Sequence, residues 1–202
     1  MMSILPFEHV LTLIGALAYA LGSYAYLRDT LAGRTKPNRI SYLMWGVTPL
    51  IGVGAAIEAH ADLWALVPVL LAGVLPLLIF CASFLNPESY WKLRPFDYIC
   101  GILSLFALIA WLVIDQPHLA LILAVAGDGF ASYPTIKKSW QHPETETAIA
   151  YLAALVGVIL AIPAIPEFTL ENTAFQGYLL LMNSTLVIAV YRRALFRVNS
   201  KP

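Results

Sequence analysis

The sequence predicts an all-α membrane protein with seven transmembrane helices, and three observations favour this fold class. The chain of 202 residues is 60% hydrophobic and 12% charged, with a mean hydropathy of +0.77, so it has too few charges to cover a soluble globule. Its apolar stretches each approach the ~20 residues that cross the hydrocarbon core of a bilayer. All twelve lysines and arginines follow the odd-numbered stretches, and none lies in the links that follow the even-numbered ones.

The predicted helices are separated by short polar links in which prolines recur, as expected of a residue that cannot continue a helix. Each stretch is long enough, or nearly so, to span the membrane once. In order along the chain, the stretches are residues 8–27, 40–57, 63–85, 97–114, 119–136, 147–163 and 175–191.

The distribution of cationic residues predicts which way the chain threads the membrane. Lysines and arginines follow the first, third, fifth and seventh stretches, and the even-numbered links contain none. Because cationic loops resist translocation, the N-terminus is expected outside and the C-terminus in the cytoplasm. We expect a multi-pass protein of a bacterial inner membrane, in contact with the lipid bilayer. The formal net charge of zero suggests no nucleic-acid partner.

An internal repeat emerges when the chain is shifted by 109 residues. Among the identical residues that the shift superposes are two neighbouring pairs: Ser23 on Ser132 with Tyr24 on Tyr133, and Tyr42 on Tyr151 with Leu43 on Leu152. Residues 1–90 and 117–202 are therefore predicted to form two parallel three-helix repeats, joined by a connector helix in residues 91–116. Together they make one membrane domain over residues 1–202, in a 3+1+3 arrangement.

The segment SYPTIKKSWQHPETE, at the inner end of the fifth stretch, carries a proline followed by a basic loop with serine and threonine. Its matching residues are Pro134, Lys137, Lys138 and Ser139. Together with the 3+1+3 arrangement, this segment resembles the SWEET sugar transporters and the wider PQ-loop (MtN3-like) group. In the first repeat, Ala25 stands where that group has its proline. The resemblance implies a transporter with a central path, working by alternating access and needing no cofactor.

Asp128 is the only acidic or basic residue away from the ends of the predicted helices. A carboxylate at that depth costs about 2.5–3.5 kcal/mol on insertion scales, so it should face the bundle interior or water. It either stays protonated or is hydrated by a polar cavity. We predict that it binds solute hydroxyls or couples transport to protons. The alternative is a neutral aspartic acid that hydrogen-bonds to a neighbouring helix.

Four more residues are predicted to line the path. Asn183, central in the seventh stretch, resembles the midplane asparagine of SWEET-type transporters, or else bonds between helices. Tyr19 coincides with Asp128 under the repeat and is predicted to donate to its carboxylate. Trp45 resembles the aromatic residue that packs on sugar rings, or else anchors the chain at a membrane interface. Thr48 completes the predicted solute site.

Other residues are assigned to helix geometry. Pro49 and Pro134 each remove a backbone donor and are predicted hinges, although transmembrane helices also tolerate prolines without hinging. Pro143 is expected in the first turn of the sixth helix. Glu144 and Glu146 are expected only to favour the N-terminus of that helix.

Neither a metal site nor an enzyme is predicted. The outer links are expected to be solvated loops because the spacing of their potential ligands fits no tight motif: Glu58, His60, Asp62, Asp115 and His118. Hydrolase, metalloprotease and nucleotide-binding motifs are absent from the sequence. The predicted function is alternating-access transport of a small polar solute, sugar-like or another small metabolite. The alternative is a heptahelical receptor, sensor or assembly protein without flux. A homo-oligomer is left open.

Overall fold

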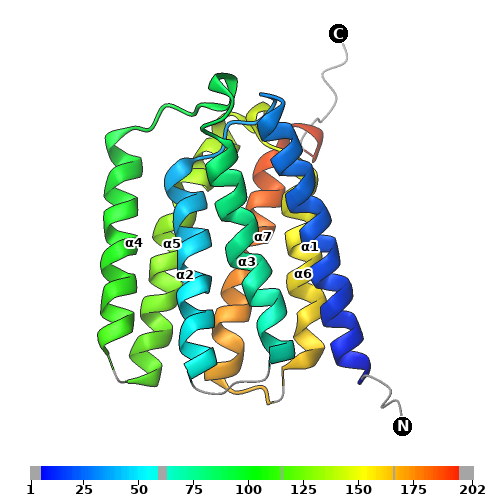
Figure 1. Ribbon diagram of the computed structural model, residues 1–202, viewed down its shortest axis with the longest axis vertical. Coiled ribbons are helices and arrows are strands. Elements are labelled where there is room, and N and C mark those ends of the chain that lie inside the picture. The colour runs from blue at the N-terminus through cyan, green and yellow to red at the C-terminus, as the bar shows by residue number, and fades with distance from the viewer. Residues whose placement is uncertain (1–5, 59–62, 115, 166, 196–202) are drawn as a thin grey trace.

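The computed structural model describes residues 6–58, 63–114, 116–165 and 167–195, and this part of the chain is all-helical (Figure 1). It contains no strand; seven α-helices are joined by short links, three of which contain a 3-10 turn. The helices are α1 (Phe7–Leu31), α2 (Arg39–Glu58), α3 (Leu63–Ala82), α4 (Pro95–Val113), α5 (Pro117–Gln141), α6 (Ala148–Ala161) and α7 (Leu170–Leu195). The 3-10 turns are η1 (Pro87–Ser89), η2 (Pro143–Thr145) and η3 (Ile162–Ala164).

Four of the described helices are long and apolar enough to cross a membrane. These are Phe7–Leu31, Pro95–Val113, His118–Gln141 and Thr173–Leu195, and two shorter apolar helices cover Val67–Ala82 and Ala148–Ala164. The outside of the bundle is apolar as well, with more than 60% of the surface of Ile122, Phe106 and Leu181 exposed. Large exposed apolar surfaces of this kind mark contact with a partner or a membrane.

Several helices extend beyond the apolar stretches that predicted them. Helix α5 continues to Gln141 and α7 begins at Leu170, because a hydropathy pattern marks only the apolar part of a helix. Helix α6 is shorter than predicted. It ends at Ala161 and gives way to η3, where Pro163 lies in the first turn.

Successive helices run in opposite directions, so α1 begins at one end of the bundle and α7 finishes at the other (Figure 1). One end contains the α1–α2, α3–α4 and α5–α6 links and the last turn of α7. Every lysine and arginine in the described ranges lies at or near this end, which we call the basic end.

Helix neighbours follow the same pattern in the first three and last three helices. Helix α3 contacts both α1 and α2, and α7 contacts both α5 and α6 (Figure 1). The two groups meet where α1 packs on α6 and α2 packs on α5. Helix α4 lies outside these six and packs on α5 and α2.

An aromatic core in the half of the bundle nearer the basic end joins the two groups. The ring of Tyr26 in α1 lies 5.1 Å from that of Tyr42 in α2 and 6.2 Å from that of Tyr151 in α6, centroid to centroid. All three side chains are buried. The aliphatic members of the cluster come from α3 and α7: Ile79, Leu186 and Val190.

Glycines allow α1 and α6 to approach until their backbones touch. A Cβ added at Gly15 would lie 3.1 Å from the Gly157 carbonyl oxygen, and one added at Gly22 would lie 2.5 Å from the Cβ of Ala153. Small residues in this pattern allow close contact between membrane helices. The α1–α6 contact is therefore the closely packed side of the interface between the two groups.

Replacing Gly22 with valine is expected to destabilise the protein by about 1–3 kcal/mol, because the new side chain has no room against α6. The measurement is the midpoint of thermal unfolding in detergent. Gly177→Ala is the matched control, since nothing lies within 4 Å of its added Cβ, and it should leave the midpoint unchanged or higher. Equal midpoints for the two variants would contradict close packing at Gly22.

Candidate functional site

Asp128 lies near the centre of α5 and belongs to a polar network that joins three helices. Its Oδ2 accepts a hydrogen bond of 2.7 Å from the Tyr178 hydroxyl of α7 and one of 3.0 Å from the Ser132 hydroxyl, one turn along α5. The Ser132 oxygen accepts a bond of 3.1 Å from the indole Nε1 of Trp45 in α2. We call these four residues, Trp45, Asp128, Ser132 and Tyr178, the Asp128 network.

The network leaves part of its hydrogen-bonding capacity free. A carboxylate offers about four acceptor positions, and Oδ2 of Asp128 takes both bonds described above, which leaves Oδ1 without a protein donor among the described residues. The Asp128 side chain is only partly buried. The site can therefore accept a hydroxyl or ammonium donor from a solute, or exchange a proton.

The other predicted site residues are not part of this network. Asn183 is buried in α7, and its Nδ2 donates to the carbonyl oxygen of Leu179, one turn earlier, at 2.9 Å. Tyr19 and Thr48 are half-buried. Within the described ranges neither donates a hydrogen bond to Asp128, and the phenol that does so comes from α7 instead of α1.

Sequence reasoning missed Tyr178. The predicted seventh helix began at residue 175, which placed Tyr178 in its first turn, where an aromatic residue is usually an interface anchor. In the structure α7 begins at Leu170, so Tyr178 lies in the third turn and reaches Asp128. The polar run from Glu171 to Thr173 could have been taken as the first turn of the helix.

A second polar cluster lies at the basic end around Glu146, in the link before α6. Glu146 Oε1 is 2.8 Å from Lys138 Nζ, and both side chains are almost fully buried. Glu146 Oε2 accepts hydrogen bonds from the hydroxyls of Tyr26 at 2.6 Å and Tyr151 at 2.8 Å. Ser139 donates to Oε1 at 3.2 Å. We call Tyr26, Lys138, Ser139, Glu146 and Tyr151 the Glu146 cluster.

The Glu146 cluster corrects the assignment of this residue to helix geometry. Glu144 is indeed exposed and lies in η2, but Glu146 is buried and holds α1 to α5 and α6. Pro143 begins η2, and α6 starts only at Ala148. A buried charge must be paired and hydrogen-bonded, and each carboxylate oxygen here has at least two partners.

Further polar contacts join the end of α1 and the α1–α2 link to the α5–α6 link. Asp29, near the end of α1, accepts a hydrogen bond of 2.8 Å from Thr147 and pairs with Arg28 and Arg34. The backbone N–H of Lys36 donates to the carbonyl oxygen of Thr145 at 3.0 Å. The first three helices are thus bound to the last three at the basic end by polar contacts.

Both predicted hinge prolines lie inside helices, Pro49 in α2 and Pro134 in α5. Pro134 is fully buried and lies one turn after Phe130 and Ala131. The Ser41 hydroxyl of α2 donates to the Ala131 carbonyl oxygen at 2.6 Å. Such a bond provides a partner for the backbone where a proline weakens a helix. The turn of α5 that precedes Pro134 is thus hydrogen-bonded to α2, just beyond the Asp128 network.

The predicted loop residues at the end of the bundle opposite the basic end are only partly described. His60, Asp62 and Asp115 lie outside the described residues. Among the residues that are described, no group of three or more histidine, cysteine or acidic side chains is placed to hold a metal ion.

Comparison of the chain with family models, with curated proteins and with solved structures finds no match.

Proposed function

We propose that the chain is a seven-helix transporter of a small polar solute, similar in plan to the SWEET and PQ-loop group. Its basic end faces the cytoplasm, as the one-sided distribution of cations favours. Helices α1–α3 and α5–α7 are two parallel repeats, and α4 connects them. The solute passes between the repeats by alternating access, and Asp128 lies on its path.

The repeat is supported by side-chain burial at positions 109 residues apart. Ser23 and Ser132 are both buried, whereas Tyr24 and Tyr133 are both more than half exposed. The same agreement holds for two further aligned pairs, one buried and one exposed: Tyr42 with Tyr151, and Leu43 with Leu152. A chance alignment in an apolar chain would not favour agreement in burial.

Helix packing also supports two equivalent repeats. Exchanging α1 with α5, α2 with α6 and α3 with α7 converts each contact within one repeat into a contact within the other. The same exchange converts the α1–α6 contact into the α5–α2 contact. This is the pattern of a pseudo-twofold axis between the repeats, where transporters of this plan have their solute site.

The observation on which transport depends is the partly buried carboxylate of Asp128 at mid-helix, whose Oδ1 has no protein donor among the described residues. Ionisable groups at this depth usually mark ion or solute pathways. The network reaches α2 on one side and α7 on the other, through Trp45 and Tyr178. A solute bound there would thus contact both repeats. The Glu146 cluster, at the basic end, is the contact that would have to open for release into the cytoplasm.

One observation favours the alternative of a receptor, sensor or assembly protein. Asp128 is bonded to Tyr178 and Ser132, and Asn183 to the backbone of its own helix, as in a protein that needs no solute. In that case the same interior would only hold the helices together.

Reconstitution in liposomes distinguishes these functions. Purified protein is first screened for thermal stabilisation by small sugars, polyols and amino acids, since a ligand of the folded state raises its apparent stability. Uptake of the stabilising solutes is then followed with and without an imposed pH gradient, against protein-free liposomes. We expect saturable uptake of at least one solute. A solute that stabilises the protein but never crosses would contradict transport and support the receptor.

A further inference from the structure

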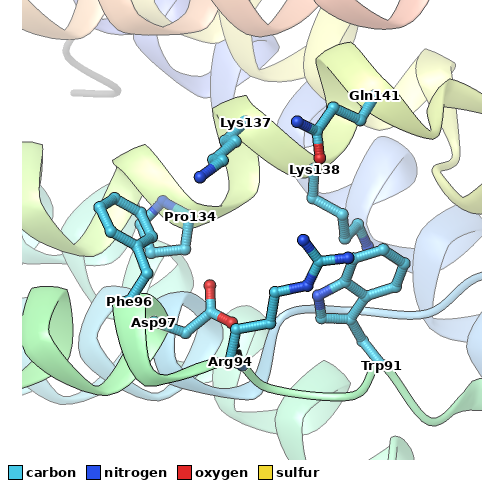
Figure 2. A pocket seen from close by; sticks show the side chains of 8 residues that line it. All are labelled: Trp91, Arg94, Phe96, Asp97, Pro134, Lys137, Lys138 and Gln141. Atoms are coloured by element: carbon cyan, nitrogen blue, oxygen red, sulfur yellow. Dashed lines mark hydrogen bonds between the residues drawn. The ribbon is translucent and has the colours of Figure 1, made fainter.

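A recess at the basic end lies between the α3–α4 link, the start of α4 and the last turns of α5. Its volume is about 300 Å³, including the space open to solvent. Figure 2 shows the side chains of Arg94, Lys137 and Gln141 converging on it from different sides, with the Trp91 ring along one wall. The remaining lining residues are Phe96, Asp97, Pro134 and Lys138.

The charges around this recess do not cancel. Asp97 accepts hydrogen bonds from the Arg94 backbone N–H at 2.6 Å and from the Asn38 amide at 3.2 Å. Lys138 is paired with Glu146. Arg94 and Lys137 have no carboxylate partner among the described residues, and the Lys137 ammonium lies 4.4 Å from the centre of the Phe96 ring.

The recess continues into an apolar surface along one face of α5. Phe130 and Tyr133 are exposed and lie two turns and one turn before Lys137, respectively, so all three share a helix face. Ile122 extends the same side of α5 away from the basic end and is also exposed. The face is therefore apolar along its length and cationic at the basic end. This arrangement is complementary to a lipid with apolar acyl chains and an anionic headgroup.

We propose that this recess binds the phosphate-bearing headgroup of an anionic lipid, whose acyl chains lie on the exposed face of α5. Arg94 and Lys137 supply the positive charge, and Gln141 and the Trp91 indole are placed to donate hydrogen bonds. Basic recesses at the cytoplasmic ends of membrane helices suit such headgroups. The inference depends on the membrane orientation proposed above but not on transport.

The test measures lipid binding by native mass spectrometry of the protein in a neutral detergent. Phosphatidylglycerol should bind more tightly than phosphatidylcholine with the same acyl chains. Lys137→Gln should weaken phosphatidylglycerol binding about fivefold, and Arg94→Gln by a similar factor. Lys92→Gln is the matched control, because Lys92 is an exposed cation in the same link that does not line the recess, and it should leave binding unchanged.

Two results would overturn the proposal. Equal phosphatidylglycerol binding by Lys137→Gln, Lys92→Gln and the unmodified protein would place the lipid elsewhere. Glycerol phosphate or inorganic phosphate that displaces the lipid and stabilises the protein equally well would show that the recess recognises a free anion. Because Lys137 is exposed, its replacement should leave the fold intact, and thermal unfolding of each variant verifies this.

Discussion

Replacing Glu146 with glutamine is expected to lower the free energy of unfolding by about 3–5 kcal/mol, because it leaves a buried ammonium group without its counter-charge. The side chains of Lys138 and Glu146 are 1% and 0% exposed, so water cannot take the place of the lost carboxylate. The amide can still accept from Tyr26 and Tyr151, so the loss reports mainly on the charge. The measurement is chemical or thermal unfolding in detergent.

A matched control and a double variant make this prediction specific. Glu144→Gln, two residues earlier, removes an exposed carboxylate that pairs with Arg193 at the surface, and should cost less than about 1 kcal/mol. Combining Glu146→Gln with Lys138→Gln removes both buried charges and should recover much of the loss. Equal destabilisation by the Glu144 and Glu146 variants would contradict a buried ion pair.

The sequence was sufficient to predict helix number because each helix contains an apolar stretch near membrane length, and each of the seven predicted stretches overlaps one of the seven α-helices of the described residues. Their ends were harder to predict. The last turn of α5 contains Lys138, Ser139 and Gln141, and these polar residues lead hydropathy alone to exclude it from the helix. The fold class could therefore be predicted from composition and from the length and spacing of the apolar stretches. Helix boundaries, in contrast, depend on polar residues that favour either a helix or a loop.

The two polar clusters show what sequence reasoning could and could not find. Asp128 was identifiable because a charge inside an apolar stretch is costly wherever it points. Glu146 was not, because a glutamate beside a predicted helix N-terminus has an ordinary role there. Only the tertiary structure, which brings the Tyr26 hydroxyl from a position 120 residues away, shows that Glu146 is buried.

Replacing Asp128 with asparagine is expected to reduce solute flux in liposomes about tenfold or more and to abolish any response to a pH gradient. The amide has the size of the carboxylate but carries no charge and cannot take up or release a proton. Hydrogen bonds to a charged group contribute about 1.5–3 kcal/mol, which corresponds to roughly one to two orders of magnitude in binding. The measurement is uptake of the stabilising solute at matched protein density, with and without the gradient.

The loss of flux in Asp128→Asn is compared with that in Tyr178→Phe and in a variant of an exposed carboxylate. Removing the Tyr178 hydroxyl leaves Ser132 as a donor to Asp128, so we expect a loss of about two- to tenfold. Glu88→Gln neutralises an exposed carboxylate in η1 and should leave flux unchanged. If Asp128→Asn transports at the normal rate with its gradient response intact, proton coupling through Asp128 is wrong. A normal rate that never depended on the gradient would instead make the protein a uniporter whose solute site lies away from the Asp128 network.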